Sequence, residues 1–218
     1  MKKKMIWVVA CLALFSGVVL SVTHADGFQI ESQYVCQTEG WSSPLSYDKD
    51  GLLKGVITSL CQAPKSTRQG LISLGGVLID ETVKTAQIIH SGPRSGNYQG
   101  MPATRYDITT RFDGDSDTMS IRSDLFVATD QVKRLIYANL SKKVSGSGAA
   151  NYIKKLDIFI ETVPDGKAGY YFRLSAAVIL DKPFFLPEDS FKSQADQALR
   201  KQYLKSRSEW APKIADAL

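Results

Sequence analysis

Apolar and polar residues alternate over long stretches between residues 104 and 181, which is the pattern of strands that bury one face. The longest alternation covers residues 169–181, where every second residue from Phe172 to Leu180 is apolar. Similar runs occupy residues 104–112, 119–127 and 156–160. We therefore predict a meander of antiparallel strands over this part of the chain.

The spacing of apolar residues changes after Pro183. Phe191, Ala195 and Leu199 recur at intervals of one helical turn, which places them on one side of a helix. Pro212 is expected to kink or end this helix, because its ring removes an amide donor. The pattern predicts an α+β fold in which a curved antiparallel sheet of about seven strands grips a long C-terminal helix.

The earlier segments are less regular. Residues 52–61 and 83–90 have strand composition, and residues 66–80 are expected to hold a short helix that two adjacent glycines weaken. Residues 132–144 fit either a helix or a strand, and the short linkers around them favour a strand. Residues 40–51 and 91–102 are rich in turn-forming residues, so we expect surface loops there, the second being a candidate lid over a cavity.

The first 25 residues have the composition of a secretory signal peptide. Three lysines precede an apolar run from Met5 to Val22, and Ala25 supplies the small residue that cleavage requires. An uncleaved anchor is the alternative, because the run is long enough to span a membrane. The chain is thereby divided into a signal peptide (residues 1–25), an N-terminal extension (26–51) and a main domain (52–218). This division predicts a periplasmic or secreted protein of the bacterial envelope.

Removal of the signal peptide changes the charge balance. Three of the 27 Lys and Arg residues lie in it, which leaves 24 against 22 Asp and Glu. A net charge of about +2 gives no support to nucleic-acid binding. Lys142, Lys143, Lys154 and Lys155 are expected together across one hairpin, as part of a solvated sheet face or, in the alternative, as a membrane-surface patch.

Two cysteines, Cys36 and Cys61, remain in the predicted mature chain. An even pair in an exported protein typically forms a disulfide, which is our prediction. Two buried free thiols are the alternative. Only one histidine accompanies them, so a metal site built from Cys and His is not expected.

The sequence offers few candidates for metal binding or catalysis. Residues 113–117 and Asp124 have the acidic spacing of a calcium-binding EF-hand loop, but Thr118 stands where that loop needs glycine, so a hairpin turn is the better interpretation. His90 beside Arg94 is a candidate for acid–base chemistry. The common hydrolase and phosphate-binding motifs are absent from the sequence. We predict no metal and no cofactor, and we favour a binding protein over an enzyme.

The order of these elements resembles the helix-grip superfamily, which includes START lipid-transfer domains, plant allergen-type ligand carriers and polyketide cyclase-like proteins. A strand, a short helical stretch, about six further strands and a long helix follow one another over residues 52–217. The N-terminal extension and the cysteine pair depart from that pattern. The resemblance implies an elongated apolar cavity between the sheet and the C-terminal helix. The residues that would line it are Tyr106, Ile108, Met119, Ile121, Leu125, Leu156, Ile158, Phe172, Leu174, Ala176, Phe191, Ala195 and Leu199.

These residues have two interpretations, because alternation shows which face is inside and not whether the inside is empty. A cavity of this lining predicts a carrier or binding protein for a lipid or another hydrophobic small molecule. A filled hydrophobic core is the alternative. An interaction or inhibitor module that uses Trp41 and Tyr47 in the loop of residues 40–51 is a second possible function class. A cyclase-like or hydrolase-like enzyme that uses His90 is a third.

Overall fold

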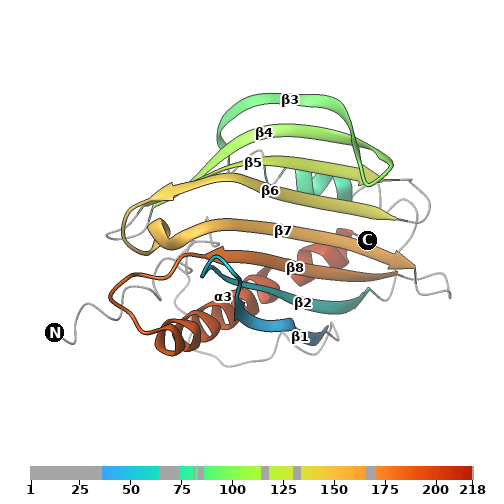
Figure 1. Cartoon of the computed structure of the whole chain (residues 1–218). Helices are drawn as coiled ribbons and strands as arrows, with labels where there is room; N and C mark the ends of the chain where they lie inside the picture. Colours follow the sequence, from blue (N-terminus) through green and yellow to red (C-terminus); the bar gives the residue numbers. More distant parts are fainter. Residues whose placement is uncertain are drawn as a thin grey trace, which may run out of the picture.

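The structure, a computed structural model, describes residues 36–63, 74–80, 82, 86–113, 118–129, 134–164 and 170–217. Eight strands form one sheet, and a helix of 30 residues follows them (Figure 1). The elements are β1 (Cys36–Tyr47), β2 (Leu53–Ala63), β3 (Ala86–Tyr98), β4 (Met101–Asp113), β5 (Thr118–Thr129), β6 (Leu135–Gly146), the 3-10 helix η4 (Gly148–Tyr152), β7 (Ile153–Pro164), β8 (Tyr170–Leu180) and α3 (Glu188–Ala217). The predicted α+β fold is confirmed, and residues 74–80 are also helical.

Each strand of the sheet is antiparallel to its neighbours. The order across the sheet is β1-β2-β8-β7-β6-β5-β4-β3. Strands β3 to β8 form the predicted meander, and β2 joins it beside β8. The strands bend in Figure 1, and α3 lies against one face of the sheet, which we name the inner face. The opposite face is named the outer face.

The first strand corrects the prediction for the N-terminal part of the chain. We expected residues 40–51 to form a surface loop, but the residues up to Tyr47 belong to β1. This strand lies at one edge of the sheet and brings the number of strands to eight. The chain turns only after this point, where the Asp48 carboxylate accepts hydrogen bonds from the amides of Asp50 and Leu52, each at 2.9 Å. Three register shifts between β1 and β2 accommodate the turn-forming residues within the strand.

The predicted loop over residues 91–102 is also wrong. β3 and β4 pair along this stretch, and the tight turn is at Gln99 and Gly100, whose φ angles are 52° and 83°. The side chain of Asn97 accepts a hydrogen bond from the Gly100 amide at 3.0 Å. Pro93 is tolerated because β3 is an edge strand, in which half of the amides need no partner strand. This segment is therefore a hairpin and not a lid.

Helix α3 confirms the predicted C-terminal helix and continues through Pro212, which was expected to kink or end it. Its two halves contact two apolar clusters on the inner face. The first inner cluster joins the second half of α3 to residues 74–80 and to the middle of the sheet, and includes Leu74, Leu78, Ile108, Leu125, Phe172, Tyr203 and Ile214. The second inner cluster joins the first half of α3 to the other end of the sheet, and includes Leu45, Leu53, Met119, Leu156, Phe191 and Leu199.

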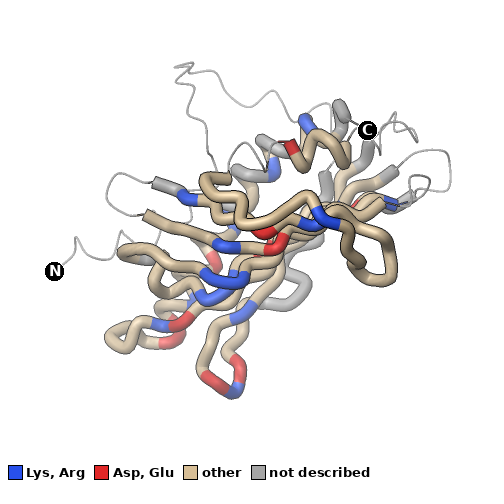
Figure 2. The backbone as a smooth tube through the Cα atoms, turned by 90° about the horizontal axis from the view of Figure 1, so that it is seen from above, with Lys and Arg blue, Asp and Glu red and all other residues tan. Residues whose placement is uncertain are grey.

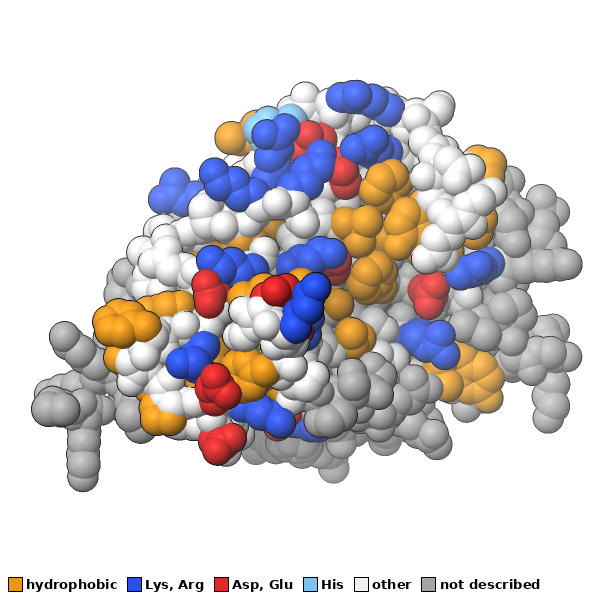
Figure 3. All heavy atoms as spheres, in the orientation of Figure 1, with side chains coloured by type: hydrophobic (Ala, Val, Ile, Leu, Met, Phe, Trp, Pro, Cys, Tyr) orange, Lys and Arg blue, Asp and Glu red, His pale blue; other side chains and the backbone are white. Residues whose placement is uncertain are grey.

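The outer face carries a smaller apolar cluster beside charged side chains (Figure 3). Its buried members are Ala103, Ala128, Ile136 and Ala138. Phe126 packs against them, and the guanidinium of Arg105 lies 5.3 Å from the centre of its ring. The outer face is therefore only partly polar.

Candidate functional site

The thirteen residues predicted to line a cavity all lie in or against the two inner clusters. Ile108, Leu125, Phe172 and Leu174 are buried in the first inner cluster, and Met119, Ile121, Leu156, Phe191, Ala195 and Leu199 are buried in the second. Tyr106, Ile158 and Ala176 are only half-buried. The ten buried residues pack as a core, so the half-buried residues are the part of the predicted lining that a bound molecule could reach.

These half-buried residues belong to one row across the sheet. Ala176 of β8 lies opposite Ile158 of β7, which lies opposite Asn139 of β6. Asn139 and Tyr106 flank Leu125 of β5, and Asn139 is also half-buried. We name Tyr106, Asn139, Ile158 and Ala176 the inner strip. It crosses the middle of the inner face.

The rows on both sides of the inner strip are buried. On one side Val127, Tyr137, Ile160 and Leu174 are each less than a tenth exposed, and on the other side so are Ile108, Ser123, Leu156 and Val178. A residue in the middle of a covered face stays partly exposed only where the covering layer does not reach it. The inner strip is therefore partly uncovered at Asn139, Ile158 and Ala176, whereas the fully buried Leu125 separates these residues from Tyr106.

Two buried hydrogen bonds fix the layer that covers the first of these rows. The hydroxyl of Tyr203 in α3 donates to the carbonyl of Leu174 at 2.6 Å. The hydroxyl of Thr82 donates to the carbonyl of Leu78 at 2.7 Å and lies 3.0 Å from the hydroxyl of Tyr137. Because α3 and residues 74–82 are held to the sheet in this way, they define one edge of the inner strip.

The inner strip has apolar walls and a few polar groups. Burial raises the pKa of Tyr137, while hydrogen bonds with Thr82 and Asn139 oppose that rise, so the phenol is neutral at physiological pH. Ser123 lies in the neighbouring row and is 2% exposed, so it belongs to the packed region. The strip can therefore hold an apolar group and offer the Asn139 amide to a polar atom.

Glycine shapes one end of the strip. Gly92 of β3 has a φ of 138°, and a Cβ atom built on it would lie 2.5 Å from Cδ1 of Tyr106. The ring of Tyr106 can therefore rest directly on the backbone of β3 only because this position has no side chain. This contact between β3 and β4 depends on the positive φ of Gly92. The alternation of apolar and polar residues therefore could not have predicted it.

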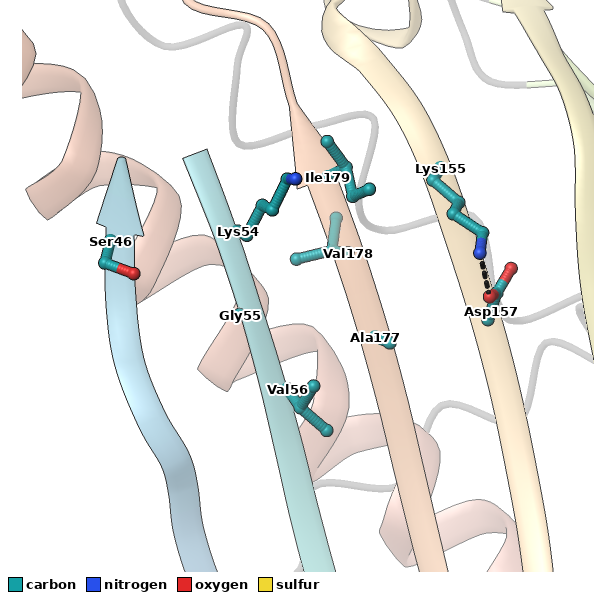
Figure 4. A pocket seen from close by; sticks show the side chains of 9 residues that line it. All are labelled: Ser46, Lys54, Gly55, Val56, Lys155, Asp157, Ala177, Val178 and Ile179. Atoms are coloured by element: carbon teal, nitrogen blue, oxygen red, sulfur yellow. Dashed lines mark ion pairs between the residues drawn. The ribbon is translucent and has the colours of Figure 1, made fainter. Parts of the chain in front are cut away.

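A separate hollow of about 240 Å³ lies on the outer face, across β2, β8 and β7 (Figure 4). Val56, Ala177 and Ile179 supply apolar surface, with Lys54 and Lys155 beside it. Lys54 is paired with Asp48, and Lys155 with Asp157 at 2.9 Å. The ammonium groups are thus already neutralised, and the hollow has no predicted lining residue.

The gap between β6 and β7 beside this hollow is closed by side chains. Beyond Asn139 and Ile158 the two strands no longer pair as a ladder. The carboxylate of Asp157 accepts hydrogen bonds from the amide and the hydroxyl of Ser141, at 2.9 and 3.0 Å. The Ser141 hydroxyl in turn accepts one from the amide of Leu156 at 2.9 Å. Asp157, although buried, therefore has a structural role.

The alternative site residues lie elsewhere. His90 is exposed on β3 and its Nε2 atom lies 2.7 Å from the hydroxyl of Thr109, away from the inner strip. Tyr47 donates its hydroxyl to the carbonyl of Glu188 at 2.9 Å, so it links β1 to α3 instead of standing free as an interface anchor. The side chain of Trp41 lies outside the described residues.

Three of the four lysines of the candidate patch are paired with carboxylates. Lys142 contacts two aspartates, Lys154 contacts Asp181 at 3.1 Å, and Lys155 contacts Asp157. Residues 114–117 of the acidic run lie outside the described residues, while β4 and β5 pair on both sides of them. In the described part of the chain there is no group of three side chains suited to a metal ion, and no helix is long and apolar enough to cross a membrane.

The register of β1 and β2 places Cys36 directly opposite Cys61, whose side chain is fully buried. Directly opposed residues in antiparallel strands have Cα atoms roughly 4.5 to 5.5 Å apart, within the range that a disulfide spans. The side chain of Cys36 lies outside the described residues, so the disulfide stays a prediction.

Comparisons with known proteins give structural neighbours only. No family model and no curated protein matches the chain. Similar solved structures include TTHA0849 from Thermus thermophilus (12% identity, 74% of this chain and 95% of that chain, TM-score 0.45). They also include Ara h 8.0201 (16%, 75% and 94%, 0.36) and a START superfamily protein from Mycobacterium smegmatis (12%, 73% and 98%, 0.30).

The topology itself defines the fold. From β2 onward the chain forms a strand, a short helix, six sequential strands of one antiparallel sheet and a long helix against the inner face. This is the element order that the sequence predicted. The chain therefore has a START-like helix-grip fold, to which β1 adds one strand at the edge.

Proposed function

We propose that this protein binds a hydrophobic small molecule, such as a lipid, along the inner strip. The observation that carries the proposal is the half-burial of Tyr106, Ile158 and Ala176 between two buried rows. An apolar molecule seated there would remove this surface from water, which is worth roughly 25 cal/mol per Å² of apolar area. The strip lies on the face of the sheet against which α3 packs, and this is the face on which the helix-grip resemblance implies a ligand cavity.

The polar groups at the strip favour a ligand with one polar end. The Asn139 amide lies in the row of the strip and is half-buried. A ligand that covers this amide would bury it at a cost in free energy, which a hydrogen bond to a polar atom of the ligand would offset. An amphiphile such as a fatty acid or a lipid with a small head group meets both requirements.

The test is to fill the strip without altering the outer face. Ala176 and Ala177 are adjacent on β8 and both half-buried, but Ala176 lies in the inner strip and Ala177 lines the outer hollow. Ala176→Trp should weaken the binding of a fluorescent fatty-acid analogue by at least about tenfold. Ala177→Trp should leave the affinity unchanged.

The matched pair gives each outcome a meaning. Unchanged affinity in both variants, or no uptake of the analogue by the wild-type protein, would contradict the proposal. Loss of binding only in Ala177→Trp would move the site to the outer hollow. Thermal unfolding of each variant, together with the smaller change Ala176→Leu, separates a filled strip from a damaged fold.

We also propose that the protein is exported to the bacterial envelope and carries a disulfide between Cys36 and Cys61. The support is the signal-peptide composition of residues 1–25 and the opposed register of the two cysteines. The intact mass of protein recovered from the envelope tests both points. It should lack the first 25 residues and be lighter by two hydrogens than the reduced chain. A mass that retains the leader, or two thiols that react after denaturation without reductant, would contradict these assignments.

A further inference from the structure

The connection between β8 and α3 presents two adjacent phenylalanines to solvent. Phe184 is 94% exposed and Phe185 is 63% exposed, and their rings pack edge to face with centroids 5.5 Å apart. This connection is at the lower left of Figure 1, and hydrophobic side chains stand at the same corner of the surface in Figure 3. Folding removes almost none of the Phe184 side chain from water, so this side chain adds almost no hydrophobic stabilisation to the fold.

The turn that carries the two rings is held in place from both sides. Pro183 is buried and Leu186 packs against the second inner cluster. The Leu186 amide donates to the Pro183 carbonyl at 3.0 Å, and the Lys182 ammonium donates to the Leu186 carbonyl at 2.9 Å. The turn that exposes the two rings is therefore held in place by packing and hydrogen bonds.

The backbone of this turn has few polar groups that still need water. The two prolines, Pro183 and Pro187, have no amide donor, and the Leu186 amide is bonded within the turn. The Pro187 carbonyl accepts from the Phe191 amide at 3.0 Å. Unpaired backbone groups are what makes insertion of a loop into lipid costly, and the prolines and these hydrogen bonds lower that cost here.

The charges around the turn are balanced. Three acidic and three basic side chains surround it in sequence or by ion pairing, namely Asp181, Glu188, Asp189, Lys154, Lys182 and Lys192. The turn therefore has no excess charge that would select an anionic surface. Hydrophobic insertion into a neutral bilayer is the interaction that these residues fit.

We propose that Phe184 and Phe185 dock this protein on a lipid bilayer by inserting into its interfacial region. We favour a bilayer over a second copy of the chain or another protein. Lipid molecules can rearrange around two protruding rings, whereas a protein partner would need a pocket of matching shape. Aromatic rings at the boundary between hydrocarbon and head groups are the usual anchors of such contacts. The inference does not depend on ligand binding at the inner strip.

The test is co-sedimentation of the purified mature protein, which lacks the apolar leader of residues 1–25, with phosphatidylcholine vesicles. Phe184→Ala/Phe185→Ala should lower the partition coefficient more than about tenfold. The control is Ile88→Ala/Ile89→Ala, which removes two adjacent side chains that are 51% and 47% exposed on the edge strand β3, separated from β8 by four strands. The control should bind within about twofold of the wild-type protein.

Two further measurements keep the proposal falsifiable. Binding should persist when salt is raised from about 50 to about 500 mM, because screening weakens charge attraction and not hydrophobic insertion. Phe185→Trp should add fluorescence that brominated lipids quench. No binding by the wild-type protein, equal loss in both double variants, or binding only to anionic vesicles at low salt would overturn the proposal. A change from dimer to monomer in the loop variant without vesicle binding would assign the rings to self-association.

The outcome is separable from that of the inner strip. Uptake of the fatty-acid analogue is measured without vesicles, and Phe184→Ala/Phe185→Ala should leave its affinity unchanged. Vesicle binding in turn should be unchanged in Ala176→Trp. Failure of either assay therefore refutes one proposal and leaves the other standing on its own result.

Discussion

A network of five charged side chains on the outer face of β4, β5 and β6 should make the stability of this protein depend on pH. Asp107 and Asp124 are opposite each other, and like charges in that position destabilise a sheet. Arg122 contacts Asp107 and Arg105 contacts Asp124, each with a nitrogen–oxygen distance of 2.9 Å. The ammonium of Lys142 bridges both carboxylates, at 3.2 and 2.7 Å. Figure 2 shows that basic and acidic positions lie close together on neighbouring stretches of the backbone.

The size of the effect follows from Asp107. The hydrogen bond from Arg122, with a further one from Lys142, lowers the pKa of Asp107 from 3.8 to about 2 against the opposing effect of burial. That difference corresponds to about 2.4 kcal/mol of folding free energy at neutral pH. The side chains of Arg122 and Lys142 are 47% and 37% exposed, so screening by water reduces the contribution to roughly 1 to 1.5 kcal/mol.

The sign of the pH dependence is fixed by the direction of that change. Because the folded-state pKa is below the unfolded-state value, the contribution is complete above about pH 5 and is lost as the pH falls toward about 2. Asp107→Asn should therefore lower the free energy of unfolding in urea by roughly 1 to 1.5 kcal/mol at pH 7, and by about half as much near pH 3. Asp124 stays in both proteins, so the difference between them isolates Asp107.

Asp196→Asn on α3 is the matched control. Asp196 pairs with Arg200 one turn away, and both side chains are about a third exposed or more. Such a pair contributes only about 0.3 to 0.5 kcal/mol. If Asp107→Asn lowers the free energy of unfolding at pH 7 by no more than this control does, Asp107 does not have the role assigned to it. The same conclusion follows if the loss of free energy is equal at pH 7 and pH 3.

Two further predictions concern the contacts that hold the sheet together. Tyr203→Phe removes the buried hydrogen bond to the Leu174 carbonyl and should lower the free energy of unfolding by about 1 kcal/mol; an unchanged urea midpoint would mean that water replaces the bond. Reduction of the predicted disulfide should lower it by about 3 kcal/mol in the chain-entropy model, and Cys36→Ser/Cys61→Ser should be insensitive to reductant. Identical melting of the wild-type protein with and without reductant would argue against the disulfide.

Strong alternation was sufficient to predict most of the sheet. Residues 169–181 became β8 and the ambiguous residues 132–144 became the greater part of β6, because both keep apolar residues on a face that the sheet can bury. The errors fell on the two edge strands. β1 and β3 contain Gly and Pro that would disrupt a central strand, but an edge strand pairs on one side only and absorbs them through bulges.

The inner strip, which is the proposed binding site, was predictable only in part. The sequence placed Ile158 and Ala176 on the inner face, since strand parity decides orientation. Their half-burial depends on where α3 and residues 74–82 stop covering the sheet, which is a matter of tertiary packing that alternation does not record. Asn139 was missed because only apolar residues were considered, although it shares the parity of Tyr137.

The exposed phenylalanines had a sequence signal that alternation does not use. Phe184 and Phe185 stand between two prolines, after the last strand and before the first turn of α3. Neighbouring apolar residues in a turn have no core to face, because a turn at the surface has only solvent on its outer side. A pair of bulky apolar residues in such a turn therefore predicts a contact with another molecule.

The inner strip and the phenylalanine turn are joined by the second inner cluster. Leu186 of the turn packs on that cluster, and its member Leu156 lies in the row beside Ile158 of the strip. One packed layer thus separates the strip from the turn at which the bilayer is proposed to dock. Strip variants should then change how much ligand is held at equilibrium, whereas turn variants should change how quickly it passes between protein and vesicles. Equal slowing by both kinds of variant would mean that the cluster, and not either surface, controls the exchange.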